Sequence, residues 1–143
     1  MSKIRLGSED IQFLNLFEKL TGAKATDMVQ TEETICFLVQ KEDMGLAIGK
    51  KGSNIEKVRS KFGKNIQVIE YSEDYAQFVK NMFQSAEIRE VRISEAGKGK
   101  NLVVKTSRRD KKNIIGVRGE KIKIARILLD RYLNLKDIII ETT

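Results

Sequence analysis

The sequence predicts an α+β protein of two similar domains in tandem, each a three-stranded sheet packed against helices. Three observations predict it. The string AIGKKGSNI at 47–55 returns as IIGVRGEKI at 114–122, with Gly49 and Gly116 lying 67 residues apart. Segments of matching periodicity surround both copies, which a chance likeness of one loop would not produce. The chain also lacks proline, which suits regular elements joined by glycine and polar turns.

The first half has the periodicity of helix, strand, strand, helix, helix, strand. Ile11, Leu14 and Phe17 recur at helical spacing after Ser8, and Gly22 can end that helix. In NIQVIEY, Ile66 and Val68 alternate with polar neighbours, as in a half-buried strand. The predicted elements are a helix over 8–22, strands over 25–30 and 34–39, helices over 43–48 and 53–62, and a strand over 65–71.

The second half repeats this order, and we place the domains at 1–71 and 72–143. AGKGKN at 96–101 indicates a hairpin turn between its first two strands. The predicted elements are a helix over 73–86, strands over 88–94 and 101–106, helices over 110–115 and 119–133, and a strand over 137–142.

Composition excludes several classes of protein. Histidine is absent and Cys36 is the single cysteine, so the usual zinc ligand sets are unavailable, and Cys36 itself is expected to be a buried thiol. No apolar run of about 18 residues occurs, and the N-terminus lacks the apolar stretch of a secretion signal. We therefore expect a cytoplasmic protein with no cofactor, no metal, no small-molecule substrate and no membrane contact.

The net charge of +7 is concentrated around the two repeated strings. Residues 44–64 hold six lysines and arginines against one acid, and residues 101–126 hold nine against two, so the remainder is net acidic. Such segregation is typical of a polyanion-binding surface, although solvated lysine-rich helix faces would give the same pattern.

Each repeated string suits a phosphate contact beside an apolar strip. Glycine permits the positive φ of a sharp turn between two helices, and the second helix would begin with amides that have no intrahelical partner. Such a helix start attracts phosphate, and neighbouring cations add to it. The flanking isoleucines could contact bases, as in a groove for a single strand. A P-loop is excluded because Gly45 and Gly49 enclose only three residues and Lys51 stands where serine or threonine should be.

These residues resemble the signature of KH domains, which is an apolar residue, Gly-x-x-Gly between two helices, and an isoleucine three positions on. The element order is similar to the type II arrangement, and two such domains in tandem resemble the archaeal NusA-like family of transcription elongation and termination factors. The resemblance implies binding of single-stranded RNA, a role in transcription termination or antitermination, and RNA polymerase or a transcription complex as a further partner. Bacterial relatives carry a polymerase-binding region and an RNA-binding barrel that we do not expect here.

The resemblance also implies which residues contact RNA. Val117 departs from the polar residue usual at its position, so the second loop would depend on Arg118 and the helix start. The implied loop residues are Gly49, Lys50, Lys51, Gly52, Gly116, Val117, Arg118 and Gly119. The implied groove and flanking residues are Ile48, Ile55, Arg59, Ile115, Lys121, Ile122 and Arg126.

A further group of cations crowds the start of the second short helix. Arg108, Arg109, Lys111 and Lys112 oppose the helix dipole there, so we favour phosphate contact over an idle solvated patch. Asp110 and Glu120 bracket the second loop and are expected to cap helices. The sequence has no histidine, no residues at metal-ligand spacing and no nucleophile beside a base. These are the usual parts of a catalytic site, so an enzyme is not predicted. The alternative function is a ribosome-associated or RNA-processing KH protein.

Overall fold

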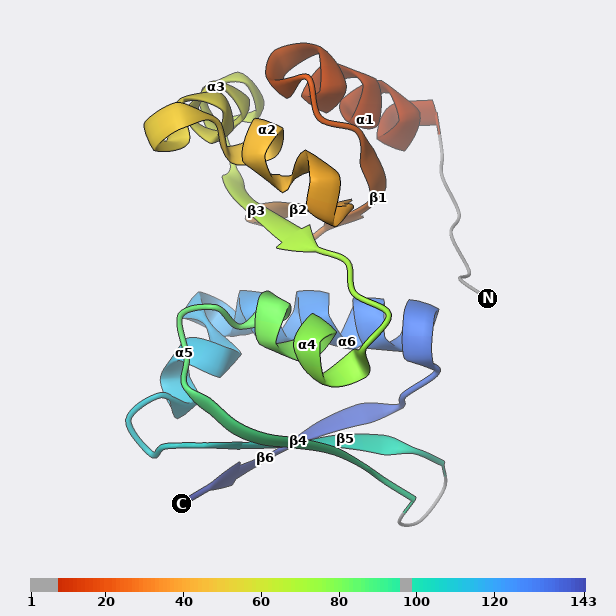
Figure 1. Cartoon of the computed structure of the whole chain (residues 1–143), viewed down its shortest axis with the longest axis vertical. Helices are drawn as coiled ribbons and strands as arrows, with labels where there is room; N and C mark the ends of the chain where they lie inside the picture. Colours follow the sequence, from red (N-terminus) through yellow and green to blue (C-terminus); the bar gives the residue numbers. More distant parts are fainter. Residues whose placement is uncertain (1–7, 96–98) are drawn as a thin grey trace. The chain divides into compact units, whose positions relative to one another are not determined.

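The computed structural model describes residues 8–95 and 99–143. It divides the chain between Ser72 and Glu73 into two compact units. Each unit has the predicted order of elements (Figure 1). The first unit consists of α1 (Ser8–Thr21), β1 (Ala25–Gln30), β2 (Thr34–Val39), α2 (Met44–Ile48), α3 (Ser53–Phe62) and β3 (Asn65–Glu70). The second consists of α4 (Tyr75–Met82), β4 (Ile88–Ser94), β5 (Asn101–Thr106), α5 (Lys111–Ile115), α6 (Glu120–Leu133) and β6 (Asp137–Thr142).

Both sheets have the same topology and the same irregularity. In each, the middle strand (β2 or β5) pairs antiparallel with the strand before it and parallel with the last strand of the unit. The antiparallel register shifts near its start in both units, between Ala25 and Asp27 and between Ile88 and Glu90. The predicted α+β class, with two three-stranded sheets packed against helices, is confirmed.

The core of the first unit lies between its sheet and its helices. Phe37 of β2 stacks on Phe17 of α1 with ring centroids 4.2 Å apart. Phe62, near the end of α3, meets Phe13 of α1 edge to face at 4.9 Å. Aromatic pairs of this kind add about 0.5–1.5 kcal/mol beyond the apolar area they bury. They fix α1 and α3 on the sheet, and with them the segment that precedes α3.

The second unit builds its core with fewer aromatic rings. Leu102 and Val104 of β5 and Ile124 and Leu128 of α6 are buried. Phe78 of α4 meets Tyr132 of α6 edge to face at 6.0 Å. In Figure 1, α4 and α6 lie on one face of the second sheet.

Most element limits agree with the sequence prediction, and one differs clearly. The helix predicted over 73–86 ends at Met82, because Phe83 leaves helical geometry with φ −123° and ψ 51°. The predicted hairpin turn at 96–101 lies partly outside the described residues. Cys36 is buried, as expected. Within residues 8–95 and 99–143, no helix is long and apolar enough to cross a membrane.

Candidate nucleic-acid interface

The two Gly-x-x-Gly loops have nearly the same backbone. Gly49 has φ 78° and ψ 170°, and Gly116 has φ 80° and ψ 168°. Gly52 and Gly119 both adopt left-handed geometry, with φ 77° and 71°. In each unit a 3₁₀ turn, Lys50–Gly52 or Val117–Gly119, joins the short helix to the long one. Both loops are therefore sharp turns immediately before a helix, as the repeated string predicts.

The first glycine of each loop is required for two reasons. Its combination of positive φ with ψ near 170° is essentially restricted to glycine. A Cβ at Gly49 would lie 2.7 Å from the backbone nitrogen of Asn54, and one at Gly116 would lie 3.0 Å from that of Lys121. A Cβ at Gly52 would meet only Ile55 at 3.8 Å, and one at Gly119 nothing within 4 Å. The first glycine thus lets the loop pack against the helix that follows, whereas the second only supplies a positive φ.

One residue in each loop has a conformation that the sequence did not predict. Lys51 has φ 55° and ψ 30°, and Arg118 has φ 56° and ψ 23°. Left-handed geometry costs a residue with a side chain about 1–2 kcal/mol. The glycines signal a turn, but nothing in the sequence marks the cation between them as the strained residue. Such strain often accompanies a functional site.

The loop amides are less available than the sequence suggests. The Gly52 amide donates to the Gly49 carbonyl at 3.1 Å, and the Ser53 amide donates to the Lys50 carbonyl. The second unit repeats both bonds, from Gly119 to Gly116 at 3.1 Å and from Glu120 to Val117. The expectation of unpartnered amides at the helix start is therefore wrong at these four positions, and attraction of phosphate depends more on the side-chain cations.

The predicted loop residues differ in exposure from their apolar neighbours. Lys50, Lys51 and Arg118 are exposed, and Val117 is 76% exposed, which excludes a core role for this valine. All four loop glycines are half-buried. Half-buried isoleucines lie close in sequence to the loops at Ile48, Ile55 and Ile115. Ile122 is only 9% exposed, so it has little surface to offer to a base.

Several of the predicted cations already have partners within their own unit. Arg59 forms an ion pair with Glu56, and Arg126 forms one with Asp137 at 3.1 Å. Lys121 donates to the Ser85 hydroxyl at 2.7 Å. The ion-paired side chains are largely exposed, and such pairs contribute about 0–1 kcal/mol, so either arginine could exchange its carboxylate for a phosphate at small cost.

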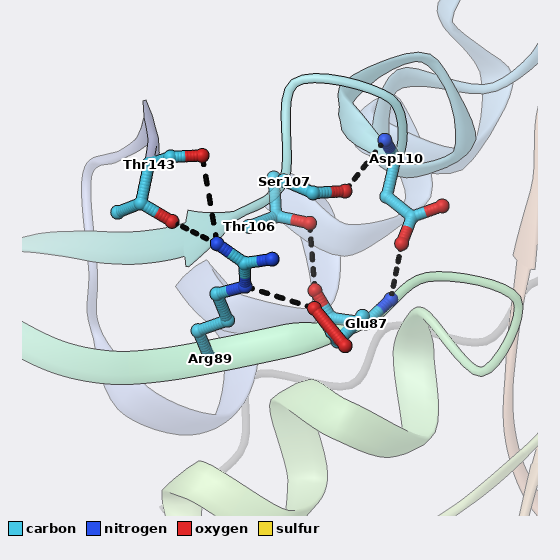
Figure 2. A network of polar contacts seen from close by, with 6 residues as sticks. All are labelled: Glu87, Arg89, Thr106, Ser107, Asp110 and Thr143. Atoms are coloured by element: carbon cyan, nitrogen blue, oxygen red, sulfur yellow. Dashed lines mark hydrogen bonds and ion pairs between the residues drawn. The ribbon is translucent and has the colours of Figure 1, made fainter.

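The predicted cations Arg108, Arg109 and Lys112 lie in a polar turn that we call the basic turn (residues 107–112). They are exposed, and so is Lys111. Asp110, in the middle of the turn, is only 9% exposed. Its carboxylate accepts the Glu87 amide at 3.0 Å (Figure 2). It also accepts the Asn113 side chain at 3.1 Å. The Thr106 hydroxyl donates to the Glu87 carbonyl at 2.6 Å, which ties the same two segments together.

Asp110 therefore has a different role from the one predicted. Its side chain makes no capping bond to α5, and Glu120 is the first residue of α6 and not its cap. The hydrogen bond from the Glu87 amide holds the pKa of Asp110 below its ordinary value, against the opposing effect of burial. Asn113, Arg109 and Ser107 lower this pKa further by smaller amounts. The carboxylate therefore stays ionised at neutral pH and joins the basic turn to the segment that enters β4.

The first loop has its own anchor, which the sequence did not reveal. The Asn54 side chain donates to the Leu46 carbonyl at 2.7 Å and to the Thr21 carbonyl at 3.3 Å. It thereby joins the start of α3 to α2 and to the end of α1. Lys121 occupies the corresponding place in the second unit, where an amide bridge of this kind cannot form.

Comparison with known proteins gives consistent matches. Residues 14–73 match the KH domain family. The chain is 40% identical over 136 residues to the protein named probable transcription termination protein NusA of Methanococcus vannielii, which covers 95% of this chain and 79% of that one. The protein of the same name from Halococcus morrhuae is 32% identical, with 95% and 97% covered. The crystal structure of APE1850 matches with a TM-score of 0.80 at 33% identity, over 95% of this chain and 100% of that one. The matches to the two relatives and to the solved structure extend over both units, whereas the KH family match lies essentially in the first.

Proposed function

The chain belongs to the family of archaeal proteins named probable transcription termination protein NusA, and we propose that it is an RNA-binding transcription factor that holds single-stranded RNA through both glycine loops. The observation that supports this most is the pair of loops with matching backbone, each of which exposes at least one cation close in sequence to a half-buried isoleucine. Residues 1–71 and 72–143 would then act as two KH domains. A KH loop clamps about four backbone nucleotides, so an RNA bound to both units would be held at two separate places.

We assign the contacts as follows. The loops hold the sugar-phosphate backbone through Lys50, Lys51 and Arg118, and bases contact Ile48, Ile55 and Ile115. The exposed side chain of Val117 would pack against the bound RNA. The remaining cations of the interface would contact phosphates that flank the loops, namely Arg59, Arg108, Arg109, Lys112, Lys121 and Arg126.

We further propose that the protein meets RNA in the cytoplasm during transcription and influences termination or antitermination. The names of the relatives support a transcription complex as its place of action. Purification of the tagged protein with its natural partners tests this. Enrichment of RNA polymerase subunits is the expected result, and enrichment of ribosomal particles alone would contradict it.

The loop assignment is tested by paired substitutions. Two paired substitutions, Lys50→Asp with Lys51→Asp and Val117→Asp with Arg118→Asp, should each weaken binding of single-stranded RNA in gel shifts at least about tenfold. Each pair removes cationic charge from its loop and adds two carboxylates that repel phosphate. The fold should persist, since these side chains are exposed and aspartate tolerates left-handed geometry.

A matched control is Lys19→Asp with Lys24→Asp, which changes the net charge as much as the first pair at exposed lysines outside the loop. It should lower affinity much less than the loop pair does, because neither lysine is a proposed phosphate contact and exposed charges are screened by salt. Thermal melting of each variant checks the fold. Unchanged affinity in the variant that combines both loop pairs would reject the assignment.

A further inference from the structure

The basic turn differs from its counterpart in the first unit more than any other part of the interface. With the offset of 67 residues, the residues corresponding to 108–112 are Lys41, Glu42, Asp43, Met44 and Gly45. The segment in the first unit has one cation and two acids, whereas residues 108–112 have four cations and one acid. At this place in the fold, the excess of positive charge is therefore found only in the second unit.

The cations of the basic turn are available for an external anion. None of Arg108, Arg109, Lys111 and Lys112 forms an ion pair within residues 8–95 and 99–143. Arg59 and Arg126, by contrast, each have a carboxylate partner. Four cations within five residues repel one another, and those at the start of α5 also oppose its dipole. The single carboxylate of Asp110 offsets only part of this repulsion, so a bound anion would be stabilised here.

The turn is also held in place before any ligand binds. Figure 2 shows Asp110 between the Glu87 amide and the Ser107 hydroxyl, which accepts from the Asp110 amide at 3.1 Å. Glu87 is tied in turn to Thr106, and its carboxylate pairs with Arg89 at 2.8 Å. Within the described residues the side chain of the corresponding aspartate, Asp43, forms no hydrogen bond or ion pair, so the first unit lacks this tie. A fixed backbone lowers the entropy lost when the side chains engage a ligand.

We propose that the second unit holds the RNA backbone beyond its glycine loop, through the basic turn positioned by Asp110, and so supplies more of the salt-dependent part of RNA affinity than the first unit does. This rests on the proposed function, because it assumes that single-stranded RNA is the ligand. The first unit, with an acidic segment at the same place, would contact phosphates mainly at Lys50 and Lys51.

The salt dependence of binding tests the proposal. The probe is a labelled single-stranded RNA of random sequence and about 20 nucleotides, long enough to cover two sites of about four nucleotides each with a spacer. The test variant carries Arg108→Gln, Arg109→Gln, Lys111→Gln and Lys112→Gln. The control carries Lys19→Gln, Lys24→Gln, Lys80→Gln and Lys136→Gln, which removes the same charge at exposed positions elsewhere.

Each lost phosphate contact should reduce the slope of log K against log salt by about 0.7, so the test variant should lose about two to three units of slope. Over a fourfold rise in salt its affinity should then fall about 16- to 64-fold less than that of the unaltered protein. The control should keep the original slope. Equal slopes in the test variant and the unaltered protein would overturn the proposal while leaving RNA binding intact. No binding by the unaltered protein would instead refute the proposed function.

Asp110 is a positioning residue in this proposal, and a double-mutant cycle separates that role from a merely structural one. Asp110→Asn should lower affinity several-fold in the otherwise unaltered protein and have no further effect when the four cations are already glutamine. Asp43→Asn, the matched change in the first unit, should have no effect on affinity. All measurements are made below the onset of melting. An equal loss in both backgrounds would show that Asp110 does not act through the basic turn and would overturn this part of the proposal.

Discussion

The first and second units have the same loop backbone and different side chains around it. At the strained cation φ is 55° in one loop and 56° in the other, and the first glycines differ by only two degrees in φ. Yet with the offset of 67 residues Lys50 corresponds to Val117, and Asn54 corresponds to Lys121. The common geometry is therefore produced by what both loops retain, which is two glycines and close packing against the following helix.

The differences show which properties of the interface can vary without changing the turn. The first loop is tied by the amide of Asn54, whereas in the second unit a carboxylate, Asp110, ties the turn that leads into α5. The segment before the loop is acidic in the first unit and strongly basic in the second. Charge and anchoring thus vary between units of one fold, so under the proposed function the two units would contact RNA in chemically different ways.

The largest expected effect tests the common packing. Gly49→Ala should reduce the free energy of unfolding by about 3 kcal/mol or more, because a nearly glycine-only conformation and a 2.7 Å clash with the Asn54 backbone act together. Gly116→Ala should cost somewhat less, since its nearest contacts are at 2.9–3.0 Å. Urea unfolding followed by circular dichroism measures both.

The matched controls are the second glycines. Gly52→Ala and Gly119→Ala meet no close atom and should cost only about 1 kcal/mol each, for left-handed geometry alone. If Gly49→Ala proved no more costly than Gly52→Ala, close packing of the loop on the helix would not be what the two units share.

A smaller effect should distinguish the two anchors. Asn54→Ala removes two hydrogen bonds and should cost about 1–2 kcal/mol, because the Thr21 carbonyl is then left without this donor in a partly buried place. Lys121→Ala removes one exposed bond to Ser85 and should cost less than about 0.5 kcal/mol. Asn54→Lys, which installs the residue of the second unit, should cost about as much as alanine. Equal effects at the two positions would contradict the difference in anchoring.

The sequence predicted the elements and the two sharp turns before helices well because both depend on local patterns. Periodicity located the strands and helices, and the repeated glycines located two turns before helices. What it missed depends on contacts between distant segments. The bond from Glu87 to Asp110 spans 23 residues and that from Asn54 to Thr21 spans 33, so neither leaves a local pattern. The ion pair between Arg126 and Asp137 depends on the path of the chain from α6 into β6, which composition does not specify.

The smallest expected effect concerns the strained cations. Lys51→Gly and Arg118→Gly relieve left-handed strain but make the unfolded chain more flexible, so each should raise the free energy of unfolding by no more than about 1 kcal/mol. RNA affinity should fall in the same variants, because each loses a loop cation. Lys50→Gly is the matched control, since Lys50 does not have a positive φ: it should weaken RNA binding similarly while lowering stability. Urea titration and gel shifts on the same samples measure both quantities. If a glycine variant is more stable but binds RNA more weakly, the strain at that position serves binding. If Lys51→Gly or Arg118→Gly instead loses stability, the surrounding packing, and not the cation, requires this conformation.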